Sequence, residues 1–139
     1  MDKEAIRQSD PIRYAQEIIG RDPFSTLLGI QVEEVREEYA RASLTIRDDY
    51  CNAEARSHGG VLFSLADQTF SVACHTRGHV TFALELKINY FEAARAGDVI
   101  TAVAAPLDIR KRVSLWNIEL TNQDKRKVAL AQALAYHMI

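Results

Sequence analysis

Hydrophobic and polar residues alternate along much of the chain, and this pattern predicts six β-strands. The first begins at Ile30 in IQVEEVREE, where the alternation slips at Glu33 and Glu34 and so predicts a β-bulge. The second alternates cleanly over 40–47, and the longest runs over 80–90. Three more follow at 98–107, from Val113, and after the turn NQDK.

The last of these segments has two interpretations. It reads KVALAQALAYHMI, and its alanine content is also compatible with a helix. We favour a strand because a turn precedes it and its residues alternate. Four alanines, at positions 129, 131, 133 and 135, would then share one face. A row of such small residues lets a helix approach the sheet closely.

One segment between the second and third strands is too long and too apolar for a strand. From Gly59 to about Arg77 no helix breaker follows Gly60, and apolar residues cover nearly all sides. This pattern predicts a long helix that is buried all round. Before the strands, Asp10 and Pro11 resemble an N-cap followed by proline at the first helical position, and Asp22-Pro23 predicts a further short turn.

Together these elements predict an α+β fold in which an antiparallel β-sheet wraps around one long central helix. We expect one domain over residues 1–139, with an N-terminal helical segment at 1–28. A single sheet leaves edges to protect, and the long 80–90 strand is the expected edge for association of two copies. The sequence therefore predicts a homodimer.

Composition narrows the choice of partners and location. The 139 residues are 47% hydrophobic and carry a net charge of −2, which disfavours nucleic acid and anionic membranes as partners. No apolar run reaches the roughly 18 residues that cross a bilayer, and the N-terminus is polar, so we expect a cytoplasmic protein. His75 and His79 lack a further ligand in a metal-binding motif, so no metal site is predicted.

Two features of the helical segment are candidates for chemistry. In SHGG, glycines occupy the expected helix start, where free N–H groups suit a phosphate, a carboxylate or an oxyanion. A tight turn alone would explain them equally simply. Asp67 is the one charged residue in 57–76, and it either belongs to a local polar cluster or acts in a reaction. It follows Gly59 by eight residues, about 12 Å along a helix.

The motifs in this region resemble those of a known family. They are Asn52, the HGG of 58–60, the LAD that ends at Asp67, and the turn Gly97-Asp98. In this order and spacing they are similar to the hotdog-fold acyl-CoA thioesterases of the PaaI type, which are linked to phenylacetate degradation. The resemblance runs from about Phe24 to the C-terminus. The hotdog fold is a long helix wrapped by an antiparallel sheet, as the residue pattern also predicts.

The resemblance implies roles for several residues. The Gly59 N–H would hold the thioester carbonyl as an oxyanion hole, with Asn52 beside it. Asp67 of the neighbouring subunit would be the general base or the nucleophile. His58 and Gly60 would bind and position the substrate. We expect a homodimer assembled into a homotetramer, and no cofactor, because coenzyme A arrives as part of the substrate.

One position departs from the family pattern. Some relatives place Ser or Thr after the helix to orient the attacking water, whereas this chain has Ala83, with Thr81 as a substitute on the same strand face. Arg110, Lys111 and Arg112 would bind the phosphates of coenzyme A, although a solvated turn also explains them.

The predicted function is hydrolysis of a small or aromatic, phenylacetyl-type acyl-CoA. Two alternatives stay open: a hotdog hydratase or dehydratase, and a non-catalytic acyl-CoA-binding protein. An enoyl thioester substrate would reveal the first, and tight binding without turnover would reveal the second.

Overall fold

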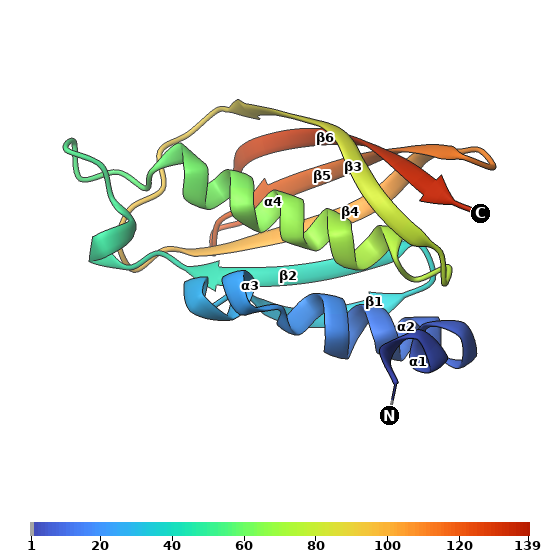
Figure 1. Cartoon of the computed structure of the whole chain (residues 1–139). Helices are drawn as coiled ribbons and strands as arrows, with labels where there is room; N and C mark the ends of the chain where they lie inside the picture. The colour runs from blue at the N-terminus through green and yellow to red at the C-terminus, as the bar shows by residue number, and fades with distance from the viewer. Residues whose placement is uncertain (1) are drawn as a thin grey trace.

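A computed structural model describes residues 2–139 and contains the predicted antiparallel sheet wrapped on a helix (Figure 1). All six strands are confirmed, and their spatial order is β1-β2-β4-β5-β6-β3. β3 is therefore an edge of the sheet, as expected. The strand bounds are β1 Gln31–Arg36, β2 Tyr39–Thr45, β3 Val80–Tyr90, β4 Val99–Ile109, β5 Val113–Thr121 and β6 Lys127–Met138.

The central helix, α4, spans Gly59–Cys74 and lies across the concave face of the sheet (Figure 1). The four alanines of β6 are at most 1% exposed, which confirms that strand and its small-residue face. The prediction of burial on all sides was wrong, because Phe63 is 37% exposed and Asp67 is also exposed. Together with Gly60, Ser64 and Ser71 they form a stripe along one side of α4, which we call the exposed stripe.

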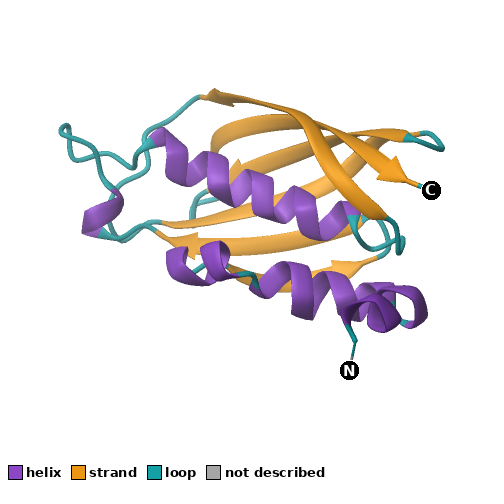
Figure 2. Ribbon diagram, viewed as in Figure 1, coloured by secondary structure: helices purple, strands orange, loops and turns teal. Residues whose placement is uncertain are grey.

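The N-terminal segment runs beside α4 on the same side of the sheet (Figure 2). Asp10 caps the helix that begins at Pro11, and Asp22 caps the helix that begins at Pro23, both by accepting a backbone N–H. A separate helix ahead of Asp10 lies within the predicted N-terminal helical segment, although its start was not assigned. The Gln68 side chain donates to the Ile19 carbonyl oxygen over 2.7 Å and so ties α4 to this segment. The helical bounds are α1 Lys3–Ser9, α2 Pro11–Arg13, a π turn Tyr14–Ile18, a 3₁₀ turn Ile19–Arg21, α3 Pro23–Leu28 and a 3₁₀ turn Asp48–Tyr50.

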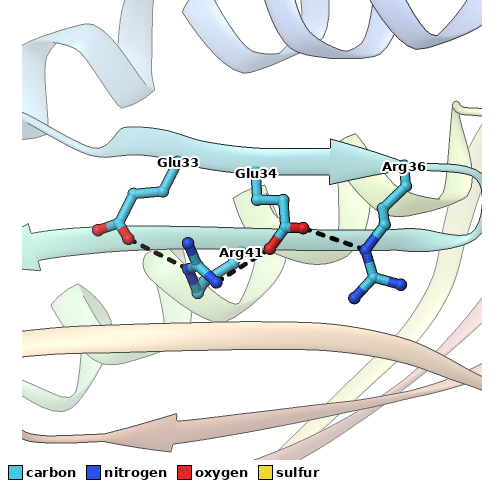
Figure 3. A network of polar contacts seen from close by, with 4 residues as sticks. All are labelled: Glu33, Glu34, Arg36 and Arg41. Atoms are coloured by element: carbon cyan, nitrogen blue, oxygen red, sulfur yellow. Dashed lines mark hydrogen bonds and ion pairs between the residues drawn. The ribbon is translucent and has the colours of Figure 1, made fainter.

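The predicted bulge in β1 is confirmed by a register shift between Val32 and Glu34. The extra residue lets two carboxylates reach one cation on β2. Arg41 Nε lies 3.2 Å from Glu33, and Arg41 Nη1 lies 2.9 Å from Glu34 (Figure 3). Glu34 also binds Arg36. Because these side chains are well exposed, the network adds little to stability and mainly covers this edge with charge.

The opposite edge, β3, carries exposed apolar side chains beside the charged Glu85 and Lys87. Phe82 and Leu84 are 52% and 59% exposed on this strand. Exposed apolar side chains on an unpaired edge strand favour association with another chain. No helix within residues 2–139 has the length and hydropathy to span a membrane.

A buried polar chain joins three strands near the C-terminal end of α4. The Trp116 indole N–H donates to Ser114 Oγ over 2.6 Å, and Ser114 Oγ lies 2.7 Å from His137 Nε2. His137 Nδ1 lies 3.2 Å from Thr81 Oγ1. The chain is satisfied throughout when His137 is neutral with its proton on Nδ1. It fixes β3, β5 and β6 to one another.

Candidate active site

A cleft of about 340 Å³ opens at the N-terminus of α4. Gly59 and Asn52, which are only seven positions apart, both line it, so the structure brings together two of the three predicted catalytic residues. The end of β3 and the segment after it form the opposite wall. The remaining lining residues are Arg56, Ser57, Leu62, Tyr90, Phe91, Glu92, Ala93 and Ala94.

The first turn of α4 leaves one backbone donor available. His58 caps the helix, and its Nδ1 accepts the Gly60 N–H over 2.9 Å. The Val61 N–H donates to the His58 carbonyl oxygen over 3.0 Å. The Gly59 N–H makes no hydrogen bond within residues 2–139. The helix dipole places partial positive charge there, so this amide can hold an anion or a polarised carbonyl oxygen.

These bonds show that Gly59 and Gly60 differ in whether their N–H groups are free. The Gly60 N–H is committed to His58, so the amide that can reach a ligand belongs to Gly59. His58 Nδ1 is committed in the same bond and must carry no proton to accept it. His58 therefore shapes the helix start.

The Asn52 side chain, which lines the cleft, uses only its amide oxygen in hydrogen bonds. Its Oδ1 accepts the backbone N–H groups of Glu54 and Arg56, at 2.9 and 3.3 Å. Because both partners are donors, the oxygen is assigned unambiguously and the NH₂ group points elsewhere. That NH₂ group makes no hydrogen bond in the described part of the chain. Two unpaired donors, one from the backbone and one from a side chain, therefore belong to residues that line the same cleft.

Asp67 lies on the exposed stripe of α4, away from this cleft. Eight residues separate it from Gly59, so the two are about 12 Å apart along the helix axis. No hydrogen bond or ion pair to its carboxylate is present in residues 2–139. Partial burial raises the pKa of the Asp67 carboxyl, and the nearby negative charge of Asp22 raises it further. A carboxylate with a raised pKa and no partner is suited to accept a proton.

Thr81 does not share the cleft. It is 7% exposed, lies at the start of β3, and bonds to His137 and to the His79 carbonyl oxygen. Nine residues of strand, about 30 Å, separate it from Tyr90 at the cleft. Ala83 lies on the exposed stretch of β3 and has no polar group to offer.

The basic turn of Arg110, Lys111 and Arg112 lies at the far end of the sheet from Gly59. The next strand begins at Val113, which pairs with Tyr136, whereas the cleft residue Tyr90 pairs with Ala129. These positions on β6 are about 23 Å apart. Arg110 is also paired with Asp108 at 2.8 Å. The turn is therefore not part of the cleft.

Two of the cleft residues that sequence reasoning missed bear on its chemistry. Arg56 lines it, and its guanidinium makes no ion pair in the part of the chain described. The Tyr90 hydroxyl donates to the Gly59 carbonyl oxygen over 2.8 Å. The position of Arg56 beside HGG was a usable signal, whereas Tyr90 lies 31 residues from Gly59 and reaches it only through the fold.

Comparisons with known proteins agree with this architecture. Residues 56–129 match the model of the thioesterase superfamily. The acyl-coenzyme A thioesterase PaaI of Escherichia coli K12 is 32% identical over 117 residues, which cover 84% of each chain. The solved structure of E. coli PaaI, from the phenylacetic acid degradation operon, has a TM-score of 0.87 at 28% identity and covers 99% of this chain and 97% of its own.

A second solved structure gives the same result. A variant of the phenylacetic acid degradation protein PaaI from Thermus thermophilus has a TM-score of 0.81 at 29% identity, covering 84% of this chain and all of its own. The predicted resemblance and the hotdog fold are thus confirmed. The chain belongs to the thioesterase superfamily.

Proposed function

We propose that the protein hydrolyses acyl-CoA thioesters to a free acid and coenzyme A. The observation that carries the proposal is the pair of unpaired donors in one cleft, the Gly59 N–H and the Asn52 NH₂ group. Both would bond to the thioester carbonyl oxygen and stabilise the negative charge that develops on it. The similarity to E. coli acyl-coenzyme A thioesterase PaaI supports the same reaction.

Asp67 supplies the base or the nucleophile in this proposal. As a base it removes a proton from water while the water oxygen attacks the carbonyl carbon. The tetrahedral intermediate then expels the coenzyme A thiolate, which takes up the proton. As a nucleophile, Asp67 would attack the carbonyl carbon directly and expel the coenzyme A thiolate, and water would then hydrolyse the resulting anhydride to the free acid. Both routes consume one water molecule and no cofactor.

The separation of Asp67 from Gly59 requires two chains. A two-fold axis beside the exposed stripe would bring Asp67 of one protomer to the Gly59 cleft of its partner. Small residues on the stripe, Gly60, Ser64 and Ser71, permit the close approach of a second helix. The exposed apolar edge at Phe82 and Leu84 favours pairing of β3 with its copy. We therefore propose a homodimer as the catalytic unit and retain the expectation of a homotetramer.

The cleft also suggests a substrate class. Leu62, Tyr90 and Phe91 give it apolar and aromatic walls, which suit a small or aromatic acyl group such as phenylacetyl. Arg56 is the nearest unpaired cation and would contact a phosphate of coenzyme A. Arg110, Lys111 and Arg112 lie far from the cleft and would contact only the distal, nucleotide end of coenzyme A, from the same or the partner protomer.

Thiol release from a panel of aromatic and straight-chain acyl-CoAs tests the proposal. We expect turnover by the wild-type protein, highest for a small or aromatic acyl group. We expect Asp67→Asn to lower kcat by about 10²-fold or more without loss of the fold, checked by circular dichroism. Unchanged turnover in the folded variant would defeat the catalytic assignment. Binding without turnover in the wild type would instead indicate a binding protein.

A further inference from the structure

The Tyr90 side chain makes two contacts with Gly59 that the proposed reaction does not yet use. Its hydroxyl donates to the Gly59 carbonyl oxygen over 2.8 Å. Its ring also covers the Gly59 α-carbon: a β-carbon placed there would lie 3.1 Å from both the ring carbon that bears the hydroxyl and the hydroxyl oxygen. Position 59 thus has no room for a side chain unless Tyr90 moves.

The peptide that joins Gly59 to Gly60 is consequently bound at both ends. Tyr90 donates to its carbonyl oxygen, and His58 Nδ1 accepts its N–H over 2.9 Å. Two successive glycines have more backbone freedom than any other pair, so an unrestrained Gly-Gly start would let the helix terminus reorient. Fixing this peptide fixes the backbone of Gly59 and hence the direction of the adjacent Gly59 N–H.

We propose that Tyr90 is a positioning residue that, opposite His58, clamps the Gly59–Gly60 peptide and aims the Gly59 N–H into the cleft. This inference rests on the proposed oxyanion role of Gly59. It identifies a role for the end of β3, which otherwise only lines the cleft. Burial raises the pKa of the Tyr90 hydroxyl above its ordinary value, so the hydroxyl keeps its proton and remains a donor at neutral pH.

Tyr90→Phe tests the clamp because it removes only the hydroxyl. We expect kcat to fall about 5- to 10-fold, less than the 10²- to 10³-fold typical for loss of a whole oxyanion donor. KM for the acyl-CoA should change less than about twofold, because the donor acts mainly in the transition state. Tyr136→Phe is the matched control, since the Tyr136 hydroxyl makes no hydrogen bond in residues 2–139 and lies at the other end of the sheet. A kcat for Tyr90→Phe within twofold of the control would overturn the proposal.

A double-mutant cycle separates positioning from general stability. Gly59→Ala places a methyl group 3.1 Å from the Tyr90 ring, so the ring must shift and the same hydrogen bond should weaken. The loss in Gly59→Ala/Tyr90→Phe should therefore be smaller than the product of the two single losses, whereas independent effects would multiply. Multiplied losses would count against the clamp.

Amide hydrogen exchange provides a readout that does not depend on turnover. In ¹⁵N-labelled protein, Tyr90→Phe should speed exchange of the Gly60 N–H and shift the Gly59 amide resonance, while Tyr136→Phe leaves both unchanged. Unchanged exchange and an unchanged resonance would refute the clamp even if the enzyme is active. Absence of turnover in the wild type, with exchange altered as expected, would refute the proposed function but leave the clamp in place.

Discussion

A site shared between two chains can be tested by mixing two inactive variants. Asp67→Asn removes the base but leaves the cleft intact. Asn52→Asp removes the amide donor and places a negative charge beside the developing oxyanion. It keeps an oxygen acceptor for the backbone N–H groups of Glu54 and Arg56, so the turn should persist. Each variant alone should retain about 1% or less of wild-type turnover.

The expected recovery follows from the helix geometry. Because Asp67 and Gly59 of one chain are about 12 Å apart, each site takes its cleft from one protomer and its carboxylate from the other. In a mixed dimer, one site combines the intact cleft of the Asp67→Asn chain with the intact carboxylate of the Asn52→Asp chain. The other site lacks both. Equal amounts give about half mixed dimers, so about a quarter of all wild-type sites are restored.

The assay is thiol release after the two variants are unfolded together and refolded, with mixed dimers counted by native mass spectrometry of differently tagged chains. The control replaces the Asn52→Asp chain with one that carries both substitutions, which forms mixed dimers without a complete site. Recovery near a quarter in the test and none in the control supports the shared site. Mixed dimers that show only the summed residual turnover of the two variants would refute the two-chain geometry.

Other expectations follow from the same structure. Asp22→Asn retains an N-cap but removes a negative charge near Asp67, so the acid limb of the pH–kcat profile should move to lower pH. An unmoved limb would show that Asp67 is not the group that titrates there. Asp67→Asn should raise the melting temperature at pH 7, measured by calorimetry. Ser114→Ala should lower the free energy of unfolding by about 2–4 kcal/mol in urea, because two buried groups lose their partner, whereas the exposed Ser9→Ala should cost about 0.5 kcal/mol or less. Burial and nearby positive charges lower the pKa of His137, so the stability of the fold should fall as pH drops below about 6.5. Equal urea unfolding midpoints at pH 7 and pH 5 would contradict this.

The strands and the central helix were predictable because their signal is local. Alternation over 80–90 and a breaker-free apolar run from Gly59 each specify one element without reference to the rest of the chain. The β1 bulge was visible for the same reason, as a slip at Glu33 and Glu34. Asp2 caps α1, a short helix that lacks a strong apolar period, so its start was not assigned within the predicted N-terminal helical segment.

The hydrogen bonds that the site groups make were not predictable, because they depend on contacts between distant parts of the chain. Thr81 has the right residue type for orienting water, but its hydroxyl is bonded to His137, 56 residues away. Gly60 has a suitable amide in the motif, but the ring of His58 occupies it. Tyr90 entered no motif and yet contacts the central glycine of HGG. The pattern named the types of group at the site, and the fold decided which atoms remain available.

The unpartnered state of Asp67 is itself an argument for its use. Its pKa is higher in the folded protein than its ordinary value. The stability it contributes is therefore present at pH values below about 3.8 and is lost as pH rises through the folded pKa. At neutral pH the ionised carboxylate thus weakens the fold. A carboxylate that caps a helix or forms a structural ion pair would instead stabilise the fold at this pH. If a carboxylate serves only the fold, its neutralisation should lower the stability of the protein. Asp67→Asn should instead raise stability and lower turnover, and that combination fits a group held for a reaction rather than for folding.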